Sequence, residues 1–181
     1  NPVVPIKLYE RRGGFNAHSS ISRLDGLETR LERDRSSVLA NGFPSEFIFN
    51  VENQRIKGKV YAFKKYSNEK EKILVDTKKY GNGILFCMNG QSNGSLPPSF
   101  FSTGGLKYEN ISKNLLVIMD CSELEPNYIF QLFQNDRERI FDNAFSKKIK
   151  DVISQELSDH SGLKQFQNEW KGSEVKSQSS K

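Results

Sequence analysis

NLLVIMDCS, residues 114–122, carries a continuous apolar run from Leu115 to Met119 that ends at Asp120. Successive side chains of a strand point to opposite faces, so a run without polar positions is typical of a strand covered on both faces. GILFCMNG, residues 83–90, is apolar on both faces in the same way. These two segments predict the centre of a β-sheet.

Other strands are expected upstream of this pair. EFIFNVEN, residues 46–53, and KGKVYAFKK, residues 57–65, alternate in the manner of strands, and KEKILVDTKK, residues 70–79, is assigned as a further strand. GQSNGSLPPSFFSTGGL, residues 90–106, reads as a loop and a short helix that begins near Pro97 or Pro98.

Helices are expected both before and after the strands in the sequence. Helical spacing of apolar residues predicts one over residues 20–37 and two more after the central strand. The first of these two helices would carry Ile129, Leu132, Phe133 and Ile140 on one face. The apolar face of the second helix would begin at Phe145. This order predicts an α+β fold, with a mixed sheet of four to five strands and helices on one face.

The chain divides by composition into four parts. Residues 1–44 are interpreted as the tail of an upstream domain or as a linker, and residues 45–158 as the α+β domain. A C-terminal helix is expected over residues 159–170, followed by a polar, disordered tail over residues 171–181. The start NPVVPIKLYE favours a fragment of a larger protein.

Composition narrows the function classes. The net charge of +5 and the pI of about 9.1 permit an anionic partner, but Lys and Arg are interleaved with Glu and Asp along the chain. No apolar run approaches a membrane span. Cys87 and Cys121 are predicted to be buried thiols in a reducing compartment, although a disulfide stays open, and His18 and His160 lie too far apart to build a zinc site.

FCMNGQSNG, residues 86–94, is a first candidate site. A central strand that runs into Asn89, Gly90 and Gln91 presents amides and backbone N–H groups at a strand end, where ligand-binding groups often collect. A simple turn explains the same residues and is favoured on local evidence.

Arg137 is a second candidate. On a helix it would leave from the edge of the apolar face beside Phe133, with a stem restrained by packing and a planar donor group suited to phosphate oxygens. Arg139 would point to solvent. A surface ion pair of Arg137 with Glu138 or Asp142 is the alternative, and periodicity favours it.

The order GILFCMNGQ, NLLVIMDCSELEP, LFQNDRERI and SKKIKDVISQEL resembles the transducer region of the GHKL ATPases, the superfamily of gyrase, MutL and the ninety-kilodalton heat-shock chaperones. The resemblance is good over residues 84–157 and weak over residues 1–83. NDRE, residues 135–138, is similar to an Asn-x-Ser-Arg-Glu motif, with Asp136 in place of Ser. Phe141 stands where the family has Gln, and Gln91 where MutL-type transducers have Arg.

The resemblance implies roles for the candidate residues. Arg137 would be the catalytic arginine that reaches the γ-phosphate of ATP, and Asn89 and Gln91 would join it as cofactor-binding residues. ATP and Mg²⁺ would be bound by an N-terminal domain of the parent protein. This chain lacks that domain's motifs, so it should neither bind nor hydrolyse ATP alone.

The resulting hypothesis is a transducer module of a cytoplasmic GHKL-like ATPase, chaperone-like or DNA-associated, that relays the nucleotide state. The missing ATP-binding domain is its expected partner, and homodimerisation is compatible with it. The alternative is a non-catalytic module that binds nucleic acid or a protein partner, with Lys64, Lys65 and Lys70 as the basic surface.

Overall fold

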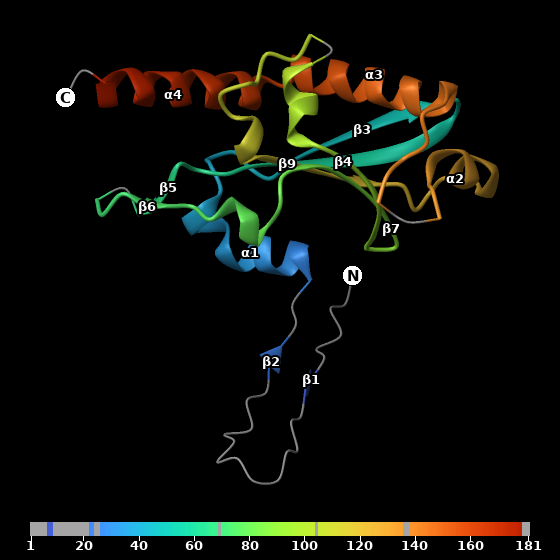
Figure 1. The fold of residues 1–181 in the computed structure, drawn as a ribbon, viewed down its shortest axis with the longest axis horizontal. Helices are drawn as coiled ribbons and strands as arrows, with labels where there is room; N and C mark the ends of the chain where they lie inside the picture. The colour runs from blue at the N-terminus through green and yellow to red at the C-terminus, as the bar shows by residue number, and fades with distance from the viewer. Residues whose placement is uncertain are drawn as a thin grey trace.

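The computed structural model describes residues 7–8, 22–23, 26–68, 70–103, 105–135 and 138–178. Its centre is a five-stranded sheet in the order β3-β4-β9-β7-β8 (Figure 1). The strands of this sheet are β3 (Ser45–Val51), β4 (Gln54–Ala62), β7 (Gly83–Met88), β8 (Gln91–Leu96) and β9 (Leu115–Asp120).

The remaining elements surround or extend this sheet. The α-helices are α1 (Leu27–Val38), α2 (Pro126–Leu132), α3 (Ala144–Asp159) and α4 (Ser161–Gln178). Short 3-10 helices are η1 (Thr77–Lys79), η2 (Pro98–Ser102) and η3 (Ser112–Asn114). Two small ladders pair β1 (Lys7–Leu8) with β2 (Ser22–Arg23), and β5 (Tyr66–Asn68) with β6 (Ile73–Leu74).

The predicted α+β class and mixed sheet are confirmed. β9 lies in the middle, parallel to β7 and antiparallel to β4, and the β3–β4 and β7–β8 pairs are antiparallel. The parallel pair requires a crossover, and the chain makes it through β8, η2 and η3. The central position of β9 in the sheet explains why the run from Leu115 to Met119 is buried on both faces.

Two hydrophobic clusters lie on opposite faces of the sheet. The larger contains Val117 and Met119 of β9 and the apolar sides of α2, α3 and α4. The smaller contains Leu116 and Ile118 of β9 and is covered by α1. The helices that follow the central strand therefore share one face, whereas α1 packs on the other (Figure 1). The origin of residues 1–44 in an upstream domain stays a prediction.

Two segments differ from the secondary structure expected from the sequence. Residues 70–79 contribute only the short β6 and η1, because Ile73 and Leu74 pair with β5 away from the main sheet and remain exposed. Residues 91–96, expected to be a loop, form the edge strand β8. Their composition is poor for a strand, so pairing with β7 imposes the conformation.

The helix predicted over Ile129 to Ile140 is wrong beyond Leu132. α2 ends there, and Phe133 and Ile140 form an antiparallel bridge. Tertiary donors take over the carbonyls at the end of α2: Phe141 N–H donates to Leu132 O at 2.9 Å, and Asn143 Nδ2 donates to Gln131 O at 2.6 Å.

The C-terminal helix α4 continues to Gln178, whereas composition predicted a disordered tail from residue 171. Half of the extra residues, 171–178, are Lys, Glu or Gln, which have good helix propensity, and they extend a helix already anchored by the buried Leu163 and Phe166. None of the helices in the described part of the chain combines the length and apolar character needed to cross a bilayer.

Candidate functional site: a groove beside the hairpin turn

A groove of about 1340 Å³ opens on the sheet face that carries α1. α1 is short, roughly 18 Å for twelve residues, and it leaves the opposite end of this face uncovered. Leu85, Cys87 and Ile118 form part of the floor, and Ile48 at the edge is 53% exposed. The first turn of α1, the strand β3 and the β7–β8 turn form the walls.

The predicted residues Asn89 and Gln91 both line this groove. Asn89 and Gly90 form the two-residue turn between β7 and β8, with positive φ values of 51° and 78°, as expected for an Asn-Gly hairpin turn. Gln91 is exposed at the start of β8. The simple-turn reading is therefore confirmed for the backbone, and the turn lies at the rim of the groove.

The turn is tied to the end of β9. The Asn89 N–H donates to the hydroxyl of Ser122 at 2.8 Å, and this hydroxyl donates to Asp120 Oδ1 at 2.5 Å. The Ser122 N–H also donates to Asp120 Oδ1, at 3.0 Å. This chain of hydrogen bonds fixes the hairpin against the central strand, so the backbone of Asn89 is held in place.

The charges in the groove are nearly balanced. Lys59 Nζ lies 3.0 Å from a carboxylate oxygen of Glu46 and 3.8 Å from one of Glu28. Desolvation opposes the charge of Lys59, but the bond to Glu46 and the nearby carboxylates outweigh it and raise the pKa of the ammonium. The lining carries carboxylates from Glu28, Glu32, Glu46 and Asp120, and cations from Arg33, Lys57 and Lys59.

Cys87 is the sole thiol that lines the groove. Burial, followed by the charges of Glu28 and Asp120, raises its pKa to about 11, so the reactive thiolate is scarce at neutral pH. Cys121 is buried on the opposite side of the sheet, and both cysteines are free. The groove therefore offers a recognition surface with no activated nucleophile at Cys87.

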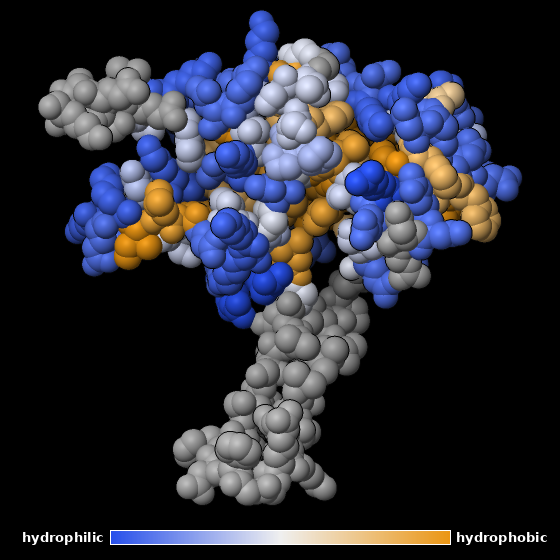
Figure 2. Space-filling view, viewed as in Figure 1, coloured by the Kyte–Doolittle hydropathy of each residue, from blue (hydrophilic) through white to orange (hydrophobic). Residues whose placement is uncertain are grey.

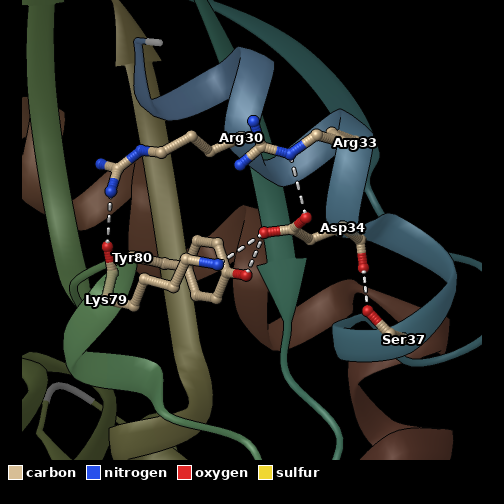
Figure 3. Close-up of polar contacts among 6 residues, drawn as sticks. All are labelled: Arg30, Arg33, Asp34, Ser37, Lys79 and Tyr80. Atoms are coloured by element: carbon tan, nitrogen blue, oxygen red, sulfur yellow. Dashed lines mark hydrogen bonds and ion pairs between the residues drawn. The ribbon is translucent and has the colours of Figure 1, made fainter. Parts of the chain in front are cut away.

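α1 is held over the sheet by a polar cluster around Asp34 (Figure 3). Asp34 Oδ2 accepts hydrogen bonds from Lys79 Nζ at 2.8 Å and from the Tyr80 hydroxyl at 2.6 Å. Arg33 Nε donates to Asp34 Oδ1 at 3.2 Å. Arg30 adds a bond to the backbone carbonyl of Lys79 at 3.1 Å. These contacts join α1 to the turn before β7 and so set one wall of the groove.

Arg137 and Asp136 lie outside the described residues. α2, the helix expected to carry Arg137, ends at Leu132. The residues after Arg137 are attached to the edge strand: the backbone N–H and hydroxyl of Ser95 both donate to Glu138 O, at 3.1 and 3.0 Å. Arg139 continues this contact as a parallel bridge to Ser95.

No zinc-type cluster of His, Cys, Asp and Glu occurs in the part of the chain that is described. His160 instead caps α4, where its Nδ1 accepts the Leu163 N–H at 3.1 Å, and its Nε2 lies 2.9 Å from the Ser45 hydroxyl. His18 lies outside the described residues.

Sequence reasoning missed the groove floor. Tyr61, Leu85 and Cys87 read as ordinary core positions because alternation shows that both faces are apolar, but not how far a helix covers each face.

Comparisons with protein-family models, with curated proteins and with solved structures find no match for this chain.

Proposed function

We propose that this chain is the transducer module of a GHKL-like ATPase. In this proposal the groove receives the ATP-binding domain of the parent protein, and Gln91 and Arg137 reach the nucleotide held there. ATP and Mg²⁺ belong to that domain. A cytoplasmic location is part of the same proposal, and so is relay of the nucleotide state to a partner.

One observation carries the proposal: both segments expected to reach the nucleotide are attached to β8. Gln91 begins this strand, and Ser95 near its end holds Glu138, the residue after Arg137. Gly94 lets the two segments lie close together, because a Cβ at this position would lie 2.8 Å from Ile140 Cγ2 and 3.4 Å from backbone atoms of Arg139 and Ile140. One rigid strand could therefore move both segments together relative to a bound nucleotide.

The groove suits a protein surface better than a free nucleotide. Its floor is apolar, its charges nearly cancel, and the exposed Ile48 adds apolar area at its edge. A polyanion would require a cationic excess that the lining lacks. Gly26, the residue before α1, also lines the groove.

The test is ATP turnover by the parent protein that carries the ATP-binding domain, with nucleotide binding measured in parallel. Arg137→Ala should lower turnover at least roughly a hundredfold, because it removes charge stabilisation in the transition state, while nucleotide binding is retained. Gln91→Ala should give a smaller loss. Arg139→Ala is the matched control. Equal turnover in the wild type and in Arg137→Ala would refute the catalytic role.

Ile48→Arg tests the docking surface separately from the chemistry. This change places a charge on the exposed edge of the groove and should lower turnover by weakening contact between the two domains. The module itself should keep its unfolding midpoint, since Ile48 is 53% exposed. Normal turnover in Ile48→Arg would exclude the groove as the docking surface.

A further inference from the structure

A second pocket, of about 320 Å³, lies between β5 and α4 and is independent of the groove. Tyr66 of β5 and Trp170 of α4 line it from opposite elements, and both side chains are half-buried. The β5–β6 hairpin and α4 extend beyond the sheet on the same side of the molecule (Figure 1). The space-filling view shows an apolar patch on the hairpin beside hydrophilic residues (Figure 2), and Ile73 and Leu74 of β6 are exposed.

Trp170 is held by a chain of aromatic contacts from the core. Phe43 and Phe166 are buried and meet edge to face with ring centroids 6.1 Å apart. Phe166 then meets Trp170 edge to face at 5.7 Å. The indole is therefore supported from the core by Phe166, and Trp170 also lines the pocket.

Two lysines line the pocket, and a third lies over the Tyr66 ring. Lys64 and Lys65 line it directly, and the ammonium groups of Lys65 and Lys72 lie 5.5 and 4.9 Å from the centroid of the Tyr66 ring. Lys171 follows Trp170 on α4 and is exposed. Glu169 is the one carboxylate among the lining residues, and it accepts a hydrogen bond from Gln165 at 2.9 Å.

We propose that this pocket binds single-stranded nucleic acid. An unpaired base would stack on Trp170 or Tyr66, and Lys65, Lys72 and Lys171 would contact the flanking phosphates. The bases of a duplex are already stacked on one another. The phosphates of a duplex could contact the lysines, but its bases could not stack on the aromatic rings. An acidic peptide likewise offers charge but no flat rings. The proposal does not depend on the ATPase function.

The intrinsic fluorescence of the protein tests the site directly, because Trp170 is the single tryptophan of the chain. Titration with a short oligothymidylate at low salt should quench this fluorescence in a saturable manner, as stacking on the indole predicts. Poly-glutamate and phosphatidylserine vesicles are the competing ligands. Absence of quenching by the oligonucleotide, or equal binding of poly-glutamate or vesicles, would overturn the proposal.

Charge-reversal variants distinguish this site from non-specific attraction. Lys65→Glu/Lys72→Glu should weaken oligonucleotide binding at least roughly tenfold and reduce the salt dependence of the affinity. Lys113→Glu/Lys147→Glu changes the net charge equally at exposed positions elsewhere. Equal losses in the two double variants would contradict a localised site. Trp170→Ala should lower the affinity roughly tenfold in an anisotropy assay, with the urea midpoint recorded to confirm folding.

Discussion

The hydroxyl of Tyr80 donates a hydrogen bond to Asp34 Oδ2 at 2.6 Å, although the two residues are 46 positions apart in the sequence. Asp34 belongs to α1, and Tyr80 follows η1 shortly before β7. Lys79 donates to the same carboxylate oxygen (Figure 3). This contact fixes how far α1 reaches across the sheet and therefore where the groove begins.

Asp34→Asn should destabilise the fold by about 1 kcal/mol at neutral pH, since it replaces charged hydrogen bonds that are partly screened by solvent. Hydrogen bonds from Lys79, then from Tyr80 and Arg33, hold the pKa of Asp34 well below its usual range. A carboxylate with a lowered pKa stabilises the fold above its unfolded pKa of about 3.9 and loses this effect as the pH falls further. Urea unfolding should therefore show a difference between wild type and variant that shrinks below about pH 4. Asp151→Asn, at an exposed position of α3, should show neither effect.

Gly58→Ala should destabilise the sheet by about 1–3 kcal/mol. Gly58 is the cross-strand partner of Phe47, and a Cβ at Gly58 would lie less than 3.0 Å from three atoms of the Phe47 ring. Adding Phe47→Ala should relieve the clash, so the two changes should be less destabilising together than their sum. Gly172→Ala in α4 has open space around it and should be neutral or stabilising. Strictly additive urea midpoints for Gly58 and Phe47 would refute the contact.

Asn143→Ala should lower the free energy of unfolding by about 1–2 kcal/mol, because Asn143 caps α3. Its side chain accepts the Ser146 N–H at 2.9 Å and donates to Gln131 O at the end of α2. Asn143→Asp keeps the acceptor for the α3 cap and removes only the donor to α2. Chemical denaturation should rank this variant between wild type and Asn143→Ala, and an Asp variant as unstable as Ala would argue against a capping role.

Protonation of His160 should weaken the fold. Burial lowers the pKa of this imidazole, against a smaller opposing effect of a backbone hydrogen bond. The unfolded chain therefore takes up a proton near pH 6.5 before the folded chain does, so stability should fall as the pH drops below that value. In His160→Gln this component of the pH dependence should disappear. The check is the urea midpoint at pH 7.5 and 5.5 in both proteins, where identical pH dependence would be the contrary result.

Cys87 should react slowly with iodoacetamide in the folded protein. Its pKa of about 11 leaves little thiolate at pH 8, and we expect a rate at least roughly tenfold below that of the urea-unfolded chain. Cys121 is fully buried and should react more slowly still. Peptide mapping by mass spectrometry separates the two sites. Rapid native alkylation of Cys87 would show that its thiol is more acidic and more open than its surroundings indicate.

The central strands could be predicted because their signal is local. Leu115 to Met119 and Ile84 to Met88 are apolar on both faces, and a sheet covered on both faces accommodates such runs. The edge strand β8 carries no such signal. The Asn-Gly pair at residues 89–90 was the available clue, because this dipeptide favours a two-residue hairpin turn and hence a strand after it.

The end of α2 could not be predicted from periodicity. Ile129, Leu132, Phe133 and Ile140 fit a helical face, but Phe133 instead pairs with Ile140, and the last carbonyls of α2 are bonded by Phe141 and Asn143. Competition between intrahelical and tertiary hydrogen bonds decides where a helix such as α2 ends. The sequence pattern reflects only the local, intrahelical contribution.

The sequence by itself determined the α+β class, the central strands, the apolar face of α3 and the position of Asn89 and Gln91 at a strand end, because each depends on side chains close together in the chain. Only the tertiary structure decided that α1 covers part of one sheet face, that Asn89 is tied to Ser122, and that Ser95 holds Glu138. These contacts join segments far apart in sequence, and their geometry follows from how layers pack and how buried polar groups find partners.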